Sequence, residues 1–491
     1  MSALEKKLYQ LIIIRLNGDE ILSASYREGL FELVRKGIGG FIIFGGRKDE
    51  VKDLVSRLQS ASKTLLFIAS DIERGVGQQI EGCTHLPSQM SIAAAIDRND
   101  DEDVEILRNA VRAVADEAAD IGINMPLIPV LDVNLNPDNP IICTRAFSDD
   151  PEDVAWYGSI YINVIERSGL LSCAKHFPGH GDTDIDSHIS LPVISKPLDE
   201  LMRTDILPFR EAVNAGVSSI MAGHLSIPAI DTLPTTISRK MIGLLRGELG
   251  YKGLIMTDAL NMDALEEIGG VAAKCMNAGF DIILHPADAA VTVRELERAV
   301  SSGEIKEEKI DAAVERILKY KSKLRAHRPA PDYKKHAELF EAISDRSIAV
   351  LKDTPGVIPL NDLQNISLIY TCDENRHDLT VLKKTFHRAV SISECSGADL
   401  SGTVVFALFT SVAAWAGSSG ISKEEIDIIK KLIENAGRSI VISFGSPYVL
   451  RHFGEADVLI AAYDPAGQAQ SSVIKCLRGE VVFQGRLPVE L

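Results

Sequence analysis

The stretch CAKHFPGHGDTDIDSH, residues 173–188, indicates both how this chain folds and where its chemistry lies. It holds three histidines, three aspartates and one lysine, and it continues the apolar run 169–173. Pro178, Gly179 and Gly181 interrupt any regular helix. The stretch therefore predicts a polar loop at the end of a buried strand, which is where α/β enzymes usually carry their active sites.

Within this loop, Asp186 and His188 stand two residues apart. In an extended chain, residues at this spacing point to the same side, so a carboxylate can lie beside an imidazole. The carboxylate of such a pair orients the ring and stabilises the imidazolium. The spacing therefore suits a general acid/base.

Outward from the loop, apolar runs alternate with amphipathic helical stretches from the start of the chain to about residue 325. The runs cover residues 11–16, 40–44, 65–70, 124–130, 170–173, 219–222, 253–256 and 281–284. Eight strand–helix units over about 300 residues predict a (β/α)8 barrel, although a doubly wound open sheet would alternate in the same way.

Polar residues follow most of these runs, and in a barrel the strand ends converge on one pocket. They are Asp71 and Glu73, Asp132 and Asn134, Lys175 and His176, His224, Asp258, and His285. This placement favours the barrel over the open sheet.

The composition shifts near residues 326–335, where Ala326 to Pro331 read as the start of a linker. Strand and helix signals resume after it. We expect a catalytic barrel over residues 1–325, a linker and connecting helix over 326–347, and a C-terminal α/β domain over 348–491.

Bulk composition limits the partners and the compartment. The net charge of −17 argues against nucleic acid and against an anionic membrane as partners. The seven cysteines have no paired spacing, which is typical of reduced thiols in a cytoplasmic protein. The apolar run near the N-terminus is too short for a signal peptide, and no run could span a membrane. We therefore expect a cytoplasmic protein.

The motif KHFPGHGDT, residues 175–183, followed by DSH, residues 186–188, resembles the signature of bacterial β-N-acetylglucosaminidases of glycoside hydrolase family 3. The resemblance extends over nearly the whole chain. It implies a TIM barrel followed by a smaller α/β sandwich domain. It also implies a retaining exo-glycosidase that acts on a small carbohydrate, such as a peptidoglycan-derived GlcNAc–anhydroMurNAc muropeptide, with no cofactor and no metal. The oligomeric state stays open.

The resemblance also implies roles for individual residues. In Thr257-Asp258-Ala259 it makes Asp258 the nucleophile, although an aspartate after a strand also suits a helix N-cap. It makes His188 the acid/base and Asp186 the partner that orients it. Most retaining enzymes use a second carboxyl group instead.

Five further residues are expected to bind the sugar by the same resemblance: Asp71, Arg145, Lys175, His176 and His224. Arg145 matches the Arg-x-Phe pattern of the family. One loop departs from the family, because residues 71–77 read DIERGVG where Asp-Gln-Glu-Gly-Gly-Arg is usual. The shape of that loop is therefore in doubt.

Two other functions remain open. An imidazole acid/base does not repel phosphate as a carboxylate would, so the same residues could support a β-N-acetylglucosaminide phosphorylase that releases GlcNAc 1-phosphate. A sugar-binding protein without turnover is the second alternative. A zinc hydrolase is disfavoured, because the histidines lack the helical i, i+4 spacing of zinc proteases.

Overall fold

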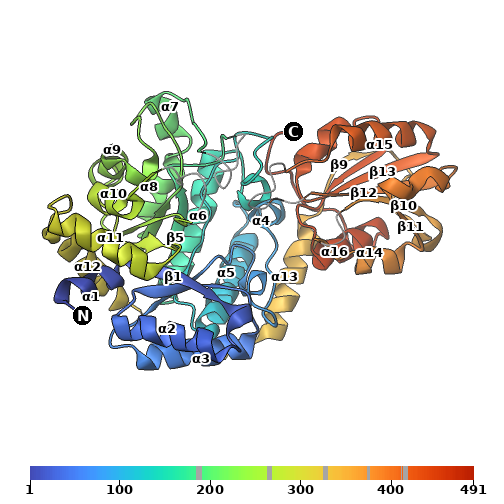
Figure 1. The fold of residues 1–491 in the computed structure, drawn as a ribbon. Coiled ribbons are helices and arrows are strands. Elements are labelled where there is room, and N and C mark those ends of the chain that lie inside the picture. The colour runs from blue at the N-terminus through green and yellow to red at the C-terminus, as the bar shows by residue number, and fades with distance from the viewer. Residues whose placement is uncertain (184–190, 262–267, 325–329, 373–375, 411, 413–418) are drawn as a thin grey trace. The chain divides into compact units, whose positions relative to one another are not determined.

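The computed structural model describes residues 1–183, 191–261, 268–324, 330–372, 376–410, 412 and 419–491. The chain forms two compact units (Figure 1). The first comprises residues 1–86, 108–133 and 150–336. The second comprises residues 87–107, 134–149 and 337–491.

The first unit contains a parallel β-barrel. The five-stranded sheet runs in the order β4-β3-β2-β1-β8, and the three-stranded sheet in the order β5-β6-β7. Single parallel bridges, Val130 to Lys175 and Met256 to Ile282, join the two sheets and close the barrel. The strands are β1 (Ile12–Asn17), β2 (Gly40–Phe44), β3 (Phe67–Ser70), β4 (Met125–Pro126), β5 (Cys173–Phe177), β6 (Ser219–Ala222), β7 (Leu254–Thr257) and β8 (Ile283–Leu284). The predicted (β/α)8 barrel is confirmed.

The strands are apolar along their length because both faces of a parallel barrel are covered, by helices outside and by side chains inside. Every residue of β3, β5, β6 and β7 is buried. The helices of this unit are α1 (Ala3–Gln10), α2 (Ala24–Lys36), α3 (Lys48–Ala61), α6 (Pro151–Arg167), α7 (Leu198–Arg203), α8 (Leu207–Asn214), α9 (Arg239–Gly243), α10 (Val271–Ala278), α11 (Ala289–Ser301) and α12 (Glu307–Lys321). Two more, α5 (Asp101–Ile121) and α13 (Tyr333–Ser347), extend across the bounds of the two units.

Local signals in the sequence set several of the helix ends. The Ser23 side chain accepts a hydrogen bond from Tyr26 N and caps α2, which ends at Gly37 with a left-handed φ of 87°. Asp150 caps α6, and Pro151 occupies its first turn, where no amide donor is needed.

A buried lysine lies at the end of the barrel where the strands begin. Lys321, the last residue of α12, donates to Gly39 O at 2.7 Å and to Gln10 Oε1 at 3.1 Å. Its Nζ also lies 4.9 Å from the centroid of the Phe67 ring. Only 3% of the residue is exposed, and burial lowers the pKa of the ammonium from 10.5 to about 7.

We expect Lys321→Met to raise the free energy of unfolding near pH 7, by about 1–3 kcal/mol. The unfolded chain holds the lysine proton up to about pH 10.5, whereas the folded chain releases it near pH 7. The contribution of Lys321 to the free energy of unfolding is therefore most favourable above pH 10.5, and it becomes less favourable as the pH falls toward 7. Gly39 O keeps its bond from Phe67 N at 3.0 Å, so the methionine leaves that carbonyl paired.

Urea unfolding of both proteins between pH 6 and pH 10 checks this expectation. The gain from methionine should be largest at the acid end and should shrink as the pH rises. Lys319→Met, an exposed change on the same helix, is the control and should show no such trend. A destabilised Lys321→Met protein at pH 7 would contradict the prediction.

The second unit is an α/β sandwich around one sheet. Its strand order is β11-β10-β12-β13-β14-β9, and every pair is parallel except β14 with β9. The strands are β9 (Ala349–Asp353), β10 (Ser367–Thr371), β11 (Arg388–Ser391), β12 (Thr403–Phe409), β13 (Arg438–Phe444) and β14 (Val458–Ala461). The helices α14 (Thr380–Thr385), α15 (Lys423–Asn435) and α16 (Gly467–Leu477) belong to this unit, as does the short α4 (Gln89–Ala95).

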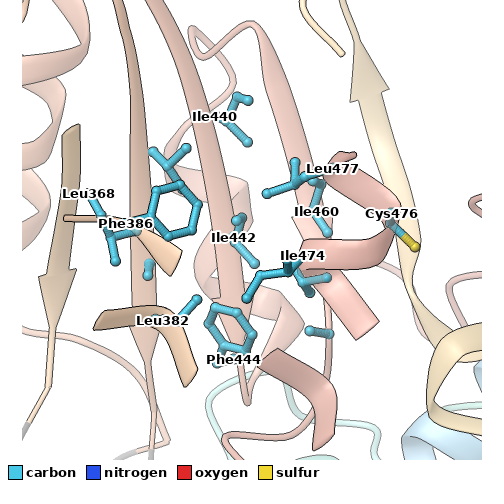
Figure 2. Packing of buried hydrophobic residues seen from close by; sticks show 14 of the residues in the cluster. Leu368, Leu382, Phe386, Ile440, Ile442, Phe444, Ile460, Ile474, Cys476 and Leu477 are labelled. Carbon is cyan, nitrogen blue, oxygen red and sulfur yellow. The ribbon is translucent and has the colours of Figure 1, made fainter. Parts of the chain in front are cut away.

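Alternation along β13 divides the core of this unit between the two faces of the sheet. Ile440, Ile442 and Phe444 lie in one hydrophobic cluster, whereas Val441 lies in the other. Figure 2 shows the first cluster, in which the β13 side chains meet Leu382 and Phe386 on one side and residues of α16 on the other. Successive strand side chains point to opposite faces, so one apolar run serves both clusters.

Candidate active site

The residues expected in the first unit lie at one end of the barrel. Asp71 follows β3, Lys175 and His176 belong to β5, His224 follows β6, and Asp258 follows β7. All are at the carboxyl ends of parallel strands, which is the catalytic end of such barrels. Arg145 belongs to the second unit, and Asp186 and His188 lie outside the described residues.

Lys175 lies between two carboxylates. Its Nζ is 2.6 Å from Asp71 Oδ1 and 2.7 Å from Glu73 Oε1. The lysine side chain is 2% exposed and that of Glu73 6%, whereas 29% of the Asp71 side chain remains exposed. A buried ammonium is tolerated only with such partners. Of these three residues, Asp71 is therefore the one whose carboxylate is partly exposed.

The unusual loop after β3 has a defined shape. Gly75 has a φ of 75°, and a side chain there would come within 2.9 Å of Leu86 N and Thr84 O. Arg74 N, at the position where the family has glycine, donates to Gln78 Oε1 at 2.7 Å. The loop therefore keeps glycine where the backbone requires it and accepts arginine at the neighbouring position.

Asp132 organises the beginning of the loop after β5. Its Oδ2 lies 2.7 Å from His176 Nδ1, and its Oδ1 accepts from His176 N at 3.2 Å and His180 N at 2.7 Å. Burial acts to raise the pKa of this fully buried carboxyl, but His176, His180 and these hydrogen bonds together hold it below the ordinary value. Asp132 is therefore a carboxylate, and it fixes the proton of His176 on Nδ1.

A second set of ion pairs ties down the described residues on either side of 184–190. Lys196 Nζ lies 2.9 Å from Asp182 Oδ2 and 3.1 Å from Asp205 Oδ2. Burial raises the pKa of Asp205, and Lys196 opposes that rise. Asp205 also excludes any side chain at Gly179, since a Cβ there would lie 2.8 Å from Asp205 Cβ. Lys196 thus links chain segments before and after the predicted acid/base pair.

Asp258 stands at the end of β7, and the backbone around it is anchored. Its amide donates to Ala222 O at 3.0 Å, and its Oδ1 accepts from Ala259 N at 2.8 Å. The preceding Thr257 accepts from Leu284 N through its hydroxyl at 3.0 Å. The carboxylate is therefore carried by a rigid strand end that is bonded to both neighbouring strands.

His224 supports the same segment. Its Nε2 lies 3.0 Å from Ala259 O and its Nδ1 lies 2.7 Å from Thr236 Oγ1. A carbonyl oxygen only accepts, so Nε2 carries the proton and Nδ1 accepts from the threonine hydroxyl. The fully buried ring therefore holds the residue that follows Asp258.

Arg145 lies in a single turn, η3 (Cys143–Arg145), of the second unit. Its Nη1 donates to Ile141 O at 3.0 Å, and its carbonyl accepts from Gln89 Nε2 at 2.8 Å. Residues 134–149 are held by the C-terminal part of that unit through Asn134–Tyr448 and Ser148–Pro488 hydrogen bonds, each 2.7 Å long. The smaller domain therefore shapes the segment that carries Arg145.

From the sequence alone, Glu73 and Asp132 are recognisable only as polar residues that follow strands, and that position assigns neither of them a role. The signal was present for Asp132, since a carboxylate after a strand can orient a histidine on the next one. The Lys196 contacts have no comparable signal in the sequence.

Over the described ranges, no group of three or more His, Cys, Asp or Glu side chains is arranged to hold a metal ion. No helix among the described residues is both long enough and apolar enough to cross a membrane.

Comparisons with known proteins agree with this architecture. Residues 3–320 match the model of the glycosyl hydrolase family 3 N terminal domain. The chain is 29% identical to beta-hexosaminidase A of Pseudoalteromonas piscicida over 94% of this chain and 90% of that protein. It is 33% identical to a beta-hexosaminidase of Neisseria meningitidis over 51% of this chain and 72% of that one.

A solved structure extends the likeness to both domains. A family 3 beta-N-acetylglucosaminidase from a Paenibacillus species superimposes with a TM-score of 0.85 at 29% identity, over 100% of this chain and 99% of the other. The match of the family model covers well over half of the sequence and contains the whole barrel. This chain therefore belongs to glycoside hydrolase family 3.

Proposed function

We propose that this protein is a retaining exo-β-N-acetylglucosaminidase that removes terminal GlcNAc from β-glycosides. The observation that carries the proposal is the set of buried, paired groups around Lys175 and His176 at the barrel end where Asp258 stands. The names of the relatives support the choice of sugar, since they are beta-hexosaminidases and a beta-N-acetylglucosaminidase.

The reaction is a double displacement. Asp258 attacks the anomeric carbon and forms a covalent glycosyl-enzyme, while His188 protonates the departing glycosidic oxygen. Asp186 orients His188 and stabilises its imidazolium. His188 then takes a proton from water, which attacks the same carbon and releases the sugar with retained configuration.

Hydrogen bonds hold the sugar, and the buried ion pairs keep the side chains that make them in position before the sugar binds. Asp71, Lys175 and His176 bind hydroxyl groups of the terminal sugar, with Arg145 as a further contact. Because Lys175 is fixed by two carboxylates and His176 by Asp132, little ordering is left for the binding step. His224 supports the chain beside Asp258, and we also propose that it lies near the sugar.

As the natural substrate we propose peptidoglycan-derived GlcNAc–anhydroMurNAc muropeptides, and as the compartment the cytoplasm. All seven cysteines are free thiols, which suits a reducing compartment. The acidic net charge suits a small sugar ligand better than nucleic acid.

The test compares hydrolysis of an aryl β-N-acetylglucosaminide with that of the matching aryl β-glucoside, each with and without phosphate. We expect kcat/KM for the N-acetyl sugar to be higher by at least about tenfold, with no dependence on phosphate. Acceleration by phosphate with GlcNAc 1-phosphate as product would instead identify a phosphorylase, which the imidazole acid/base permits. Absence of turnover on aryl sugars and muropeptides alike would favour a sugar-binding protein.

A further inference from the structure

Three residues at the catalytic end of the barrel form a cluster to which the proposed reaction assigns no role. Arg15 belongs to β1, Phe44 ends β2, and His285 follows β8. The guanidinium carbon of Arg15 lies 4.9 Å from the centroid of the Phe44 ring. The Phe44 and His285 ring centroids lie 6.0 Å apart with an interplanar angle of 38°. The order β2-β1-β8 makes the three residues neighbours across adjacent strands.

The cluster faces the same region as the Asp71–Lys175 pair. Burial, and next the positive charge of Arg15, lower the pKa of His285, whereas the negative charge of Asp71 acts to raise it. Arg15 on β1 and Asp71 after β3 therefore both act on one imidazole at the ends of their strands. This places the cluster beside the residues proposed to hold the terminal sugar.

Arg15 is exposed, and it has no acidic partner among the described residues. Within the described parts of the chain, no side chain forms an ion pair or a hydrogen bond with its guanidinium, which lies over the Phe44 ring. A guanidinium that lies over an aromatic ring is held in place while its N–H groups can still serve a ligand.

The backbone at His285 strengthens this interpretation. Its φ is 44°, in the left-handed region that side-chain-bearing residues seldom adopt, and its amide donates to Ile13 O at 2.7 Å. Backbone strain of this kind persists where the surrounding structure imposes it, and it concentrates at binding and catalytic sites. The strain holds the imidazole next to Phe44.

We propose that Arg15, positioned by Phe44 and His285, binds an anionic group, a carboxylate or a phosphate, of the ligand at this end of the barrel. This inference rests on the proposed function and deepens it, because it assigns a residue of the barrel to an anionic group of the ligand. The planar guanidinium matches both anions with two parallel N–H···O bonds. The anion has two possible sources, a substituent of the glycoside or free phosphate as the acceptor.

The test measures inhibition constants for neutral and anionic sugars against an aryl β-N-acetylglucosaminide. The probes are N-acetylglucosamine, its 1-phosphate, its 6-phosphate and N-acetylmuramic acid, with inorganic phosphate tested alone. We expect at least one anionic probe to bind the wild type about tenfold or more tightly than the neutral sugar. That preference should fall about 10- to 100-fold in Arg15→Met, with neutral N-acetylglucosamine unaffected.

Two further variants separate a binding role from a structural one. Arg15→Lys keeps the charge without the planar fork, so it should restore only part of the preference. Arg47→Met removes another exposed arginine, paired with Glu81 at 3.2 Å and close in sequence to the end of β2, and should leave the preference unchanged. Anionic probes that bind no better than the neutral sugar, or a preference that survives in Arg15→Met, would overturn the inference.

The probes also identify the source of the anion and separate this inference from the proposed function. Arg15-dependent binding of inorganic phosphate, with formation of sugar 1-phosphate, identifies the acceptor. Arg15-dependent binding of the 6-phosphate or of N-acetylmuramic acid, without that product, identifies a substituent of the glycoside. Normal hydrolysis with no anion preference removes the inference alone, whereas absence of both turnover and sugar binding removes the proposed function.

Discussion

Replacing Asp258 by alanine should abolish turnover, with kcat lowered by about 10⁴-fold or more, because it removes the carboxylate proposed to form the glycosyl-enzyme. The structure supports the choice of this residue, since its carboxylate stands at the end of β7 and is held by Ala259 N at 2.8 Å. Initial rates with an activated aryl N-acetylglucosaminide measure the loss. An active alanine variant would overturn the nucleophile assignment.

An external nucleophile makes the test specific. Azide in the space left by the Asp258 side chain can attack the anomeric carbon of an activated aryl glycoside and expel the phenolate. We expect azide to restore part of the rate in Asp258→Ala and to yield the α-glycosyl azide, the product of a single inversion. The midpoint of thermal unfolding, measured beside that of the wild type, identifies a variant that does not fold.

Replacing His188 by alanine should slow glycosides with poor leaving groups by about 10²- to 10⁴-fold and activated aryl glycosides much less. A poor leaving group departs only if it is protonated, whereas a dinitrophenolate needs no acid. The measurement is kcat/KM across a series of aryl leaving groups, whose slope against leaving-group acidity should steepen in the variant. Equal losses along the series would contradict an acid role.

Two further observations distinguish His188 from a residue that merely maintains the fold. The alkaline limb of the pH profile should disappear in His188→Ala, since it reports loss of the acid's proton. Asp186→Asn should produce a smaller change of the same kind, because it removes the charge that orients the imidazole. His387→Ala, an exposed histidine of the second unit, should change neither the slope nor the profile.

The barrel could be predicted from the sequence because its strands are short and almost wholly apolar. Runs such as 40–44 and 253–256 correspond to β2 and β7 within one residue. A parallel strand that is buried on both faces needs an uninterrupted apolar run, which the sequence displays directly. The polar residues after most of these runs then indicated the functional end of the barrel.

The contacts inside the site could not be predicted in the same way. Asp132 and His176 are 44 residues apart, and no local pattern pairs them. Nothing local distinguishes Glu73, which pairs with Lys175 at 2.7 Å, from an ordinary loop glutamate. Likewise, no sequence pattern indicated that residues 134–149, which carry Arg145, pack in the second unit.

The sequence by itself determined the alternation of strands and helices, the motif KHFPGHGDT followed by DSH with Asp186 and His188, and the position of Asp258 at a strand end. These are local properties, set by hydrophobic periodicity and by residue types at fixed spacing. The tertiary structure alone decided that Glu73 joins Asp71 in holding Lys175, which ring nitrogen of His176 carries the proton, and that Arg15 lies over Phe44. Such pairings depend on closure of the barrel, which brings together side chains from strands that are far apart along the chain.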